Sequence, residues 1–323
     1  MRVLVTGAGG FVGPYLIAAL RDQFGSGLDL VATSKDRVPH PSIGTIEALD
    51  VCDAAAVEEI VRRVQPDHIV HLAGLAAIPK AAANVDLAWN IHLFGSLHIA
   101  RAVLRHVPKS VLHHISTGQV YGASALPGLA LDETVLLAPN NTYSATKASA
   151  DLALGALAAE GLRCIRLRPF NHIGPGQSED FVVSSFAMQV ARIEAGLQEP
   201  VMRVGNLDAE RDFLDVRDIA AAYALAIKKS GELEAGAVLN IASGRPVRIR
   251  DILHRLVKLS GVQIAVEQDA ARMRPSDIPR YIGDAARARQ ILGWSPKWEF
   301  ETTLTDILND ARNRVREAAG GRA

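Results

Sequence analysis

The sequence has few of the features that mark secreted, membrane-spanning or nucleic-acid-binding proteins. Cys52 and Cys164 are its only cysteines, and their spacing fits neither a metal-binding nor a redox motif. A chain without a disulfide framework suits a reducing compartment, so we expect a cytoplasmic protein. The 35 basic and 35 acidic residues cancel, which leaves no positive field for nucleic acid or an anionic membrane.

Long hydrophobic runs are also missing. No uninterrupted apolar stretch reaches the roughly 18 residues of a membrane span, and the first apolar segment meets glycines at once, which excludes a secretory h-region. Internal repeats, heptads and low-complexity linkers are absent as well. We therefore expect a protein whose partner is a small molecule, and 323 residues favour two joined lobes.

Short apolar runs alternate with amphipathic segments through the first half of the chain. We predict strands at 2–5, 28–32, 46–49, 68–72, 110–115, 163–168 and 238–241, and helices at 14–23, 54–64, 86–105, 143–160, 181–196, 249–260 and 285–294. The alternation predicts an α/β fold with a doubly wound parallel Rossmann sheet and a smaller C-terminal α/β substrate lobe. We assign residues 1–168 to cofactor binding and 169–323 mainly to substrate binding, with segments around 213–245 crossing back.

A glycine-rich turn joins the first predicted strand to the first predicted helix. Gly7, Gly10 and Gly13 would let the backbone turn tightly and approach a pyrophosphate, with Phe11 and Val12 between them. The phosphates would lie at the positive end of the helix. Because a strand precedes the glycines and a helix follows them, the pattern predicts dinucleotide binding rather than a plain turn.

The end of the second predicted strand indicates which dinucleotide is bound. It carries Ser34 and Lys35, followed by Asp36 and Arg37, where an NAD enzyme commonly has an acidic residue for the ribose hydroxyl. A hydroxyl beside cations suits a 2′-phosphate, so NADP(H) is favoured and NAD(H) remains the alternative, with Lys35 and Arg37 then only solvated loop charges. We place Asp50 and Val51 near the adenine ring.

Tyr143 and Lys147 lie four residues apart on one face of a predicted helix, roughly 5–6 Å apart at Cβ. A fixed positive charge favours phenolate and draws the tyrosine pKa of about 10 towards the working range. This spacing also arises by chance in helices. Thr117 follows the fifth predicted strand at the sheet edge where a catalytic residue belongs.

Together these segments resemble the extended short-chain dehydrogenase/reductase superfamily over nearly the whole chain. The resemblance implies that Thr117 holds a substrate carbonyl, that Tyr143 is the acid/base, and that Lys147 lowers its pKa and binds the nicotinamide ribose. It also implies further cofactor contacts from Leu72, Ala73, Gly74 and Asn90. A non-catalytic dinucleotide sensor on the same fold is a rival interpretation, but such proteins generally lose the Tyr and Lys that this chain keeps.

Gln119 separates this chain from relatives that dehydrate nucleotide sugars. Those relatives have a glutamate at this position, two residues before a Tyr-Gly pair, to abstract the sugar C5 proton. A carboxamide has no lone pair basic enough for that step near neutrality. Gln119 therefore favours simple reduction, with a substrate-contacting role for its side chain, unless another base substitutes for it.

Two later strings resemble the GDP-mannose 4,6-dehydratase branch and its reductases. They are Phe-Asn-His-Ile-Gly-Pro-Gly-Gln at 170–177 and Gly-Asn-Leu-Asp-Ala-Glu-Arg-Asp at 205–212. Residues 169–177 are too polar for a core strand and should line the substrate cleft, whereas blocks like 204–218 often form surface helices. The resemblance implies that Asn171, Arg211 and Arg274 contact the diphosphate, that Asp277 orients Arg274 or holds a ribose hydroxyl, and that His172 touches the sugar or braces the loop.

The resemblance implies reduction of the C4 ketone of a GDP-linked 4-keto-6-deoxyhexose, GDP-4-dehydro-6-deoxy-D-mannose, to GDP-D-rhamnose. A GDP-mannose 4,6-dehydratase or another nucleotide-sugar epimerase or dehydratase remains the alternative. It also implies a homodimer through a four-helix bundle built from helices 86–105 and 143–160, although the second helix would also suit packing within one chain.

The histidines do not form an expected metal site. His68 and His71 lie three apart on a predicted strand, so they point to opposite faces and cannot share an ion. We expect five further histidines to be packing or surface residues: His92, His98, His106, His113 and His114.

Overall fold

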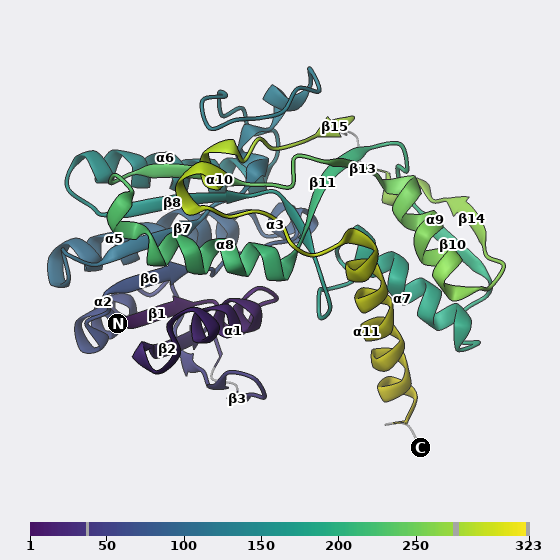
Figure 1. Cartoon of the computed structure of the whole chain (residues 1–323), viewed down its shortest axis with the longest axis horizontal. Coiled ribbons are helices and arrows are strands. Elements are labelled where there is room, and N and C mark those ends of the chain that lie inside the picture. Colours follow the sequence, from purple (N-terminus) through teal and green to yellow (C-terminus); the bar gives the residue numbers. More distant parts are fainter. Residues whose placement is uncertain (37–38, 274–277, 321–323) are drawn as a thin grey trace.

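A seven-stranded sheet, with every strand parallel to its neighbours, forms the centre of the computed structural model, which describes residues 1–36, 39–273 and 278–320 (Figure 1). The strand order is β12-β8-β7-β6-β1-β2-β5. The strands are β1 Arg2–Thr6, β2 Asp29–Ser34, β5 Glu47–Ala48, β6 His68–His71, β7 Val111–Ile115, β8 Cys164–Pro169 and β12 Ala237–Ile241. The predicted doubly wound Rossmann sheet is confirmed.

Helices cover both faces of this sheet. Successive side chains of β1 point to opposite faces and show which helices lie on each face. Val3 and Val5 belong to the hydrophobic cluster that includes α1 and α8, whereas Leu4 belongs to the cluster that includes α2 and α5. All three β1 residues are buried, as expected of a strand covered on both sides. The helices are α1 Gly13–Phe24, α2 Ala54–Val64, α5 Gly95–His106, α6 Thr142–Ala159, α8 Val216–Lys228 and α10 Ala286–Leu292.

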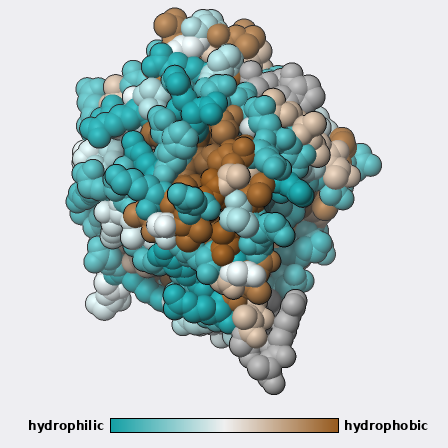
Figure 2. Space-filling view, turned by 90° about the vertical axis from the view of Figure 1, so that its right-hand side faces the viewer, coloured by the Kyte–Doolittle hydropathy of each residue, from teal (hydrophilic) through white to brown (hydrophobic). Residues whose placement is uncertain are grey.

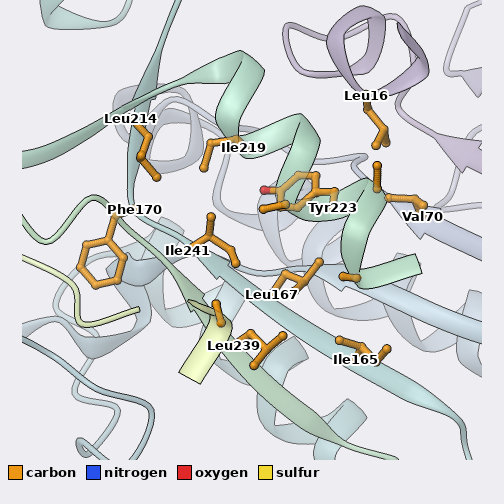
Figure 3. Close-up of a cluster of buried hydrophobic side chains, with 14 of the residues drawn as sticks. Leu16, Val70, Ile165, Leu167, Phe170, Leu214, Ile219, Tyr223, Leu239 and Ile241 are labelled. Carbon is orange, nitrogen blue, oxygen red and sulfur yellow. The ribbon is translucent and has the colours of Figure 1, made fainter. Parts of the chain in front are cut away.

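The cluster under α8 joins distant parts of the chain. Figure 3 shows the ring of Tyr223, from α8, above Leu167 of β8 and among side chains of β12 and α1. Leu239 and Ile241, which β12 contributes, are fully buried. The sheet is therefore completed by a strand that lies some 70 residues after β8 in the sequence.

The chain reverses its direction of winding beside β1. From β1 it proceeds outward through β2 to β5, and then it returns to β6 on the other side of β1 and continues to β7 and β8. Ligands of such sheets bind outside the carboxyl ends of the strands at this reversal. We therefore expect the ligand-binding site at the carboxyl ends of β1, β2, β6 and β7.

A second group of elements lies at the right of Figure 1 around its own hydrophobic cluster. Its central strand β11 pairs with β9 and β15 in parallel and with β13 in antiparallel, and β10 pairs with β14. The helices α7, α9 and α11 pack against one another beside these strands. Their bounds are β9 Asn171–Ile173, β10 Val201–Val204, β11 Glu210–Asp215, β13 Pro246–Arg248, β14 Ala265–Gln268, β15 Arg280–Tyr281, α7 Val182–Glu194, α9 Ile249–Ser260 and α11 Phe300–Gly320.

The structure decides one alternative and differs from one prediction. Residues 204–218 do not form a surface helix, which was the alternative interpretation, because 210–215 form the largely buried strand β11. The predicted helix 86–105 is interrupted, since a π-helical stretch, Asn90–Phe94, separates α4 from α5. The remaining short elements are α3 Ile78–Ala83, α4 Val85–Trp89, β3 Pro39–His40 and β4 Gly44–Thr45.

The side of the molecule on which α7, α9 and β14 lie carries exposed hydrophobic residues. Figure 2 shows hydrophobic side chains gathered near the middle of this face, with hydrophilic side chains around them. Leu259 at the end of α9 is 41% exposed and Val266 of β14 is 43% exposed. This face is at the opposite end of the molecule from α5 and α6 in Figure 1.

Candidate active site

Close backbone contacts explain two glycines of the turn between β1 and α1. Gly7 has φ +73°, and a Cβ there would lie 2.6 Å from the amide nitrogen of Ala73. A Cβ on Gly13 would lie 2.0 Å from the carbonyl oxygen of Ala8. Val12 caps α1 without a side-chain hydrogen bond, so no capping side chain competes with phosphate oxygens at the positive end of the helix. The Gly13 amide itself bonds the carbonyl oxygen of Gly10 at 3.2 Å. The turn fits a pyrophosphate.

Of the other residues predicted in this turn, Phe11 contacts the second group of elements. A Cβ on Gly10 would meet only the carbonyl oxygen of Gly7, at 3.2 Å. The ring of Phe11 is parallel to that of His172, with centroids 6.1 Å apart. The structure therefore brings the glycine turn beside β9, which carries two of the predicted substrate contacts.

The residues predicted to select the cofactor gather at the end of β2. The Ser34 hydroxyl lies 3.1 Å from the position of a Cβ on Gly9, so it borders the glycine turn. The exposed Lys35 ammonium lies 3.8 Å from a carboxylate oxygen of Asp50. Val51 packs against Gly95 at the start of α5. Arg37 lies outside the described residues.

The segment after β6 closes the other side of the glycine turn. Leu72, Ala73 and Gly74 follow this strand directly, and the backbone of Ala73 lies against Gly7. A Cβ on Gly74 would lie 3.3 Å from Nε2 of His92, and Asn90 starts the π-helical stretch that carries this histidine. The predicted cofactor residues of the first half thus surround one edge of the sheet.

Tyr143 lies in the first turn of α6, where a capping box fixes the start of the helix. Asn141 accepts a hydrogen bond from the amide of Ser144, and the Ser144 hydroxyl accepts one from the amide of Asn141. The Thr117 side chain lies close enough to the Tyr143 phenol to lower its pKa. The structure therefore brings together the two residues that were predicted to hold and protonate a carbonyl oxygen.

Burial raises the pKa of Tyr143, and the nearby Thr117 side chain only partly offsets this rise. The predicted lowering of the Tyr143 pKa by Lys147 is not found in the chain alone, where desolvation of the phenol is the largest effect. Tyr143 is thus a protonated phenol at neutral pH, which is the form that donates a proton.

Lys147 lies one helical turn after Tyr143 and is 7% exposed. Its ammonium donates a hydrogen bond to the carbonyl oxygen of Ile115 at the end of β7. Burial lowers the pKa of Lys147 to about 8, and the negative charge of Asp151 opposes this shift. Lys147 is therefore a cation at neutral pH, held at the carboxyl edge of the sheet.

Asp151 supports Lys147 from within a buried charged network. Its carboxylate accepts hydrogen bonds from Arg168 at 2.7 and 3.0 Å and from Arg166 at 3.0 Å. Burial would raise the pKa of Asp151, but the hydrogen bonds and charge of Arg168 outweigh it and the net pKa is lowered. Arg168 also donates to the hydroxyl of Tyr121, which donates to Asn240 of β12. The network fixes α6 against the sheet.

His92 is a neighbour of Tyr143 that the sequence did not single out. Its ring meets the Tyr143 ring edge to face, with centroids 5.6 Å apart. Nε2 accepts a hydrogen bond from the amide of Leu75, so Nδ1 carries the proton and donates it to the Thr146 hydroxyl, 2.7 Å away. Burial lowers the pKa of His92 to about 3, with Lys147 adding to the shift. The neutral His92 ring therefore supports the Tyr143 ring. The sequence pattern does not predict this contact, because it depends on the π-helical stretch that carries His92.

Gln119 lies in the turn that follows Thr117. This 3₁₀ turn, Gly118–Tyr121, has Thr117 as its cap, and the Thr117 hydroxyl accepts a hydrogen bond from the amide of Gln119. The Gln119 side chain remains partly accessible. The structure thus places an amide, not a carboxylate, two residues from the hydroxyl that meets Tyr143.

Three of the predicted substrate residues lie on paired strands: Asn171 and His172 on β9, and Arg211 on β11. Asn171 pairs with Phe213, and His172 with Leu214, in the β9–β11 ladder. His172 donates from Nδ1 to the carbonyl oxygen of Phe170, 3.1 Å away, which leaves Nε2 as an acceptor. Residues 171–173 are therefore a strand, but of the smaller sheet rather than of the core sheet.

Arg211 lies on β11 and hydrogen-bonds the carbonyl oxygens of Glu210 and Pro279 through its guanidinium. The other two predicted substrate residues, Arg274 and Asp277, lie outside the described residues.

The described residues contain no group of three or more histidine, cysteine, aspartate or glutamate side chains placed to hold a metal ion. The histidines pair otherwise: His71 bonds the Thr6 hydroxyl at 2.7 Å, and His68 approaches His113 at 3.2 Å. Within the same described ranges, no helix is both long and apolar enough to cross a bilayer.

A doubly wound sheet with a glycine turn after its first strand, and with Thr, Tyr and Lys meeting at the end of β7, defines a short-chain dehydrogenase/reductase of the extended type. The chain belongs to the GDP-mannose 4,6 dehydratase family, whose sequence profile matches residues 4–307. The family predicted from the sequence, and an NAD(P)-dependent enzyme on this fold, are confirmed.

Individual relatives narrow the comparison. The chain is 35% identical over 317 residues to a GDP-6-deoxy-D-mannose reductase of Pseudomonas aeruginosa, covering 98% of this chain and 99% of the relative. It is 28% identical over 328 residues to a GDP-6-deoxy-D-talose 4-dehydrogenase of Aggregatibacter actinomycetemcomitans, with coverage of 98% and 99%. The structure of RMD from Pseudomonas aeruginosa complexed with NADPH superimposes with a TM-score of 0.84 at 33% identity, covering 97% and 99%.

Proposed function

We propose that this protein reduces the C4 ketone of GDP-4-dehydro-6-deoxy-D-mannose to give GDP-D-rhamnose, using NADPH. The observation that carries the proposal is the meeting of Thr117 with Tyr143, one turn before Lys147, at the edge of the sheet beside the glycine turn. The reductase relative, similar over nearly the whole of both chains, supports the nature of the substrate.

The described side chains account for the proton in this reaction. When bound, NADPH supplies the hydride that reduces the ketone. The Thr117 hydroxyl donates a hydrogen bond to the ketone oxygen, and Tyr143 gives that oxygen its phenol proton as negative charge develops there. The Lys147 cation stabilises the phenolate that remains and would also hold a ribose hydroxyl of the cofactor. Asp151 keeps Lys147 charged, because its carboxylate raises the lysine pKa against burial.

The substrate contacts are proposals on the same footing. Asn171 and Arg211 lie on paired strands of the smaller sheet, which supports binding of a nucleotide diphosphate there, with Arg274 and Asp277 completing the site. His172 would offer Nε2 to the sugar or brace the loop beside Phe11. Residues 1–168 would thus serve the cofactor and 169–323 mainly the substrate, with 213–245 returning to the first lobe. The two free cysteines suit a cytoplasmic protein.

One assay separates reduction from the alternatives. The purified protein is mixed with NADPH and with GDP-4-dehydro-6-deoxy-D-mannose made by a separate dehydratase, and NADPH absorbance is followed. Loss of absorbance supports the reductase. NMR of the product then distinguishes the C4 configuration of rhamnose from that of 6-deoxytalose, the sugar in the name of the second relative. Constant absorbance, with GDP-mannose converted to the keto sugar, would instead show a dehydratase despite Gln119.

The end of β2 supports a preference for NADPH over NADH. Lys35 is exposed beside Ser34 at the border of the glycine turn, where it can pair with a 2′-phosphate. We expect Lys35→Asp to weaken NADPH binding about tenfold while NADH binding changes little, because one exposed ion pair is replaced by repulsion. Fluorescence titration with both dinucleotides measures the ratio, and an unchanged ratio would show that Lys35 is only a solvated charge.

We propose a homodimer through a four-helix bundle of the segments around α5 and α6. Phe94 of the π-helical stretch is 46% exposed and Leu152 of α6 is 58% exposed. The helix α6 packs against both α5 and the π-helical stretch, so these apolar residues belong to neighbouring elements. A second copy that presents the same helices would bury them on both sides of a two-fold axis.

The variant Phe94→Asp/Leu152→Asp should be a monomer, because each copy would bury two unpaired charges in place of apolar side chains. Light scattering after size-exclusion chromatography gives the mass. The control is Leu197→Asp, at a residue 62% exposed after α7, which should leave the dimer intact. A dimer that persists in the double variant would have to use another surface, such as the hydrophobic face in Figure 2.

A further inference from the structure

Tyr281 of β15 connects the smaller sheet to the turn that carries Thr117. Its hydroxyl donates a hydrogen bond to the carbonyl oxygen of Gly118 at 2.7 Å and accepts one from the amide of Gly122 at 3.0 Å. These two glycines are the two ends of the 3₁₀ turn, and they lie about 160 residues before Tyr281 in the sequence. One phenol thus holds both ends of the turn.

The Tyr281 side chain is buried against an aromatic neighbour. The residue is 3% exposed, and its ring packs against Phe170, with centroids 5.8 Å apart. A Cβ on Gly118 would lie 2.9 Å from the Phe170 ring, so the turn is pressed onto the same aromatic group. Burial raises the pKa of Tyr281, which therefore remains a neutral phenol able to donate and accept.

The position of Thr117 depends on this turn. Thr117 caps it through the hydrogen bond from the amide of Gln119, and a single 3₁₀ turn has little internal rigidity of its own. The amide of Gly122 bonds the carbonyl oxygen of Gln119 at 3.1 Å, so this group is shared between the turn and Tyr281. If the Tyr281 hydroxyl is removed, a buried carbonyl loses its partner and the turn can shift.

On the other side, Tyr281 pairs directly with Arg211 in the parallel β11–β15 ladder. The adjacent Asp212 fixes the same ladder, because its carboxylate accepts hydrogen bonds from the amides of Gly283 and Gly244. A strand that carries a proposed diphosphate contact is therefore joined, through one side chain, to the residue proposed to hold the ketone.

We propose that Tyr281 is a positioning residue for ketone reduction: its hydroxyl fixes the turn that sets the Thr117 hydroxyl against the substrate oxygen, and it links that turn to the strand of Arg211. This inference rests on the proposed function for its substrate, but the link itself can be tested without any substrate. It also explains why a tyrosine, rather than a phenylalanine, packs against Phe170 at this position.

The first test is Tyr281→Phe, which keeps the ring and removes only the hydroxyl. We expect kcat to fall at least about tenfold, since a small misplacement of a catalytic group is costly, while KM for the keto sugar and NADPH affinity change little. Thermal unfolding verifies that the variant is folded at the assay temperature. A kcat within about twofold of the wild type would overturn the proposal.

A double variant shows whether the hydroxyl acts through Thr117. In a Thr117→Ala background, Tyr281→Phe should lower kcat by less than about twofold, because the group that it positions is already gone. An equal loss in both backgrounds would mean that Tyr281 acts on something else. The matched control is Tyr223→Phe, a tyrosine of the same hydrophobic cluster whose buried hydroxyl has no hydrogen-bond partner among the described residues. It should retain wild-type kcat, and a loss as large as that of Tyr281→Phe would contradict a specific role.

Amide hydrogen exchange decides the link independently of activity. In Tyr281→Phe the amide of Gly122 and its turn should exchange faster than in the wild type, whereas in Tyr223→Phe they should not. If the wild type does not reduce the keto sugar, the proposed function is wrong. The exchange result then still tests whether the Tyr281 hydroxyl holds the turn that carries Thr117. Unchanged exchange in Tyr281→Phe would overturn it.

Discussion

Tyr143→Phe should lower turnover of the keto sugar about a thousandfold and leave NADPH binding nearly unchanged. The substitution removes only the phenol oxygen, so the packing of the ring against His92 is retained. General acid catalysis of this kind typically contributes 10²–10⁴-fold. Stopped-flow or steady-state NADPH oxidation measures the rate, and fluorescence titration measures binding.

The pH dependence of the residual activity provides a second test of this variant. If Tyr143 supplies the proton, the remaining rate of Tyr143→Phe should rise as the solution becomes more acidic, because solvent must then provide it. Thr117→Ala serves as the comparison, since it removes the hydrogen bond to the ketone but keeps the acid. A Tyr143→Phe protein with most of its wild-type rate would remove this tyrosine from the mechanism.

The second large effect expected is a loss of stability between about pH 6.5 and pH 5. His71, His92, His113 and His114 are each at most 2% exposed. Burial lowers the pKa of all four, to about 3 for His71 and His92, and the Lys147 charge adds to the lowering for three of them. They are neutral in the folded chain, whereas the histidines of an unfolded chain take up protons below their ordinary pKa of 6.5.

The sign follows from this difference. As the pH falls below 6.5, the histidines of the unfolded state bind protons, whereas the same buried histidines of the folded state stay neutral. The free energy of unfolding therefore decreases. At pH 5 each such histidine costs about 2 kcal/mol, which makes the sum a large part of a typical stability of 5–15 kcal/mol. The pKa values of the buried Asp212 and Asp218 and of the half-buried Glu133 are raised chiefly by burial, so proton uptake by these carboxylates in the folded chain opposes the loss.

Urea unfolding from pH 7.5 to pH 5 tests this expectation, with the midpoint falling steadily on the acid side. In His114→Leu the slope of stability against pH should be smaller by about 1.4 kcal/mol per pH unit, the value for one proton. Leu259→Gln, which removes no titratable group from an exposed position of α9, should leave the slope unchanged. A midpoint that is constant over this range would contradict the expectation, because it would mean that the folded chain takes up protons as readily as the unfolded chain.

The regular elements of this protein could be predicted because local patterns determine them. The helices α2 and α9 have the predicted bounds, Ala54–Val64 and Ile249–Ser260, and in α2 the side chain of Asp53 caps the first turn. The residues proposed to be catalytic could be placed near one another because Thr117 follows a strand, and Tyr143 and Lys147 open the next helix, at the edge to which a parallel sheet directs its ligands.

Other parts could not be predicted, because polar residues there are satisfied by distant partners. Asp212 and Asp215 give β11 the pattern of a surface segment, yet both are buried, with Asp212 bonded to amides of other loops and Asp215 to the hydroxyl of Thr303 in α11. The interruption of the helix at Asn90–Phe94 gave no signal in the apolar pattern. The role of His92 depends on that interruption, and that of Tyr281 on a contact across about 160 residues.

The position of β12, far after β8 in the sequence, affects how the central sheet can fold while the chain is being synthesised. Residues 237–241 pair with β8 and cover one edge of the sheet, while α8 closes one of its faces. A nascent chain that has emerged only to residue 168 therefore holds the glycine turn but exposes Leu167 and the edge of β8. The dinucleotide-binding half cannot finish folding ahead of the rest on the ribosome, although domains of multidomain proteins generally can. For the same reason, a protease cut between the halves would yield two fragments with incomplete cores rather than two stable modules.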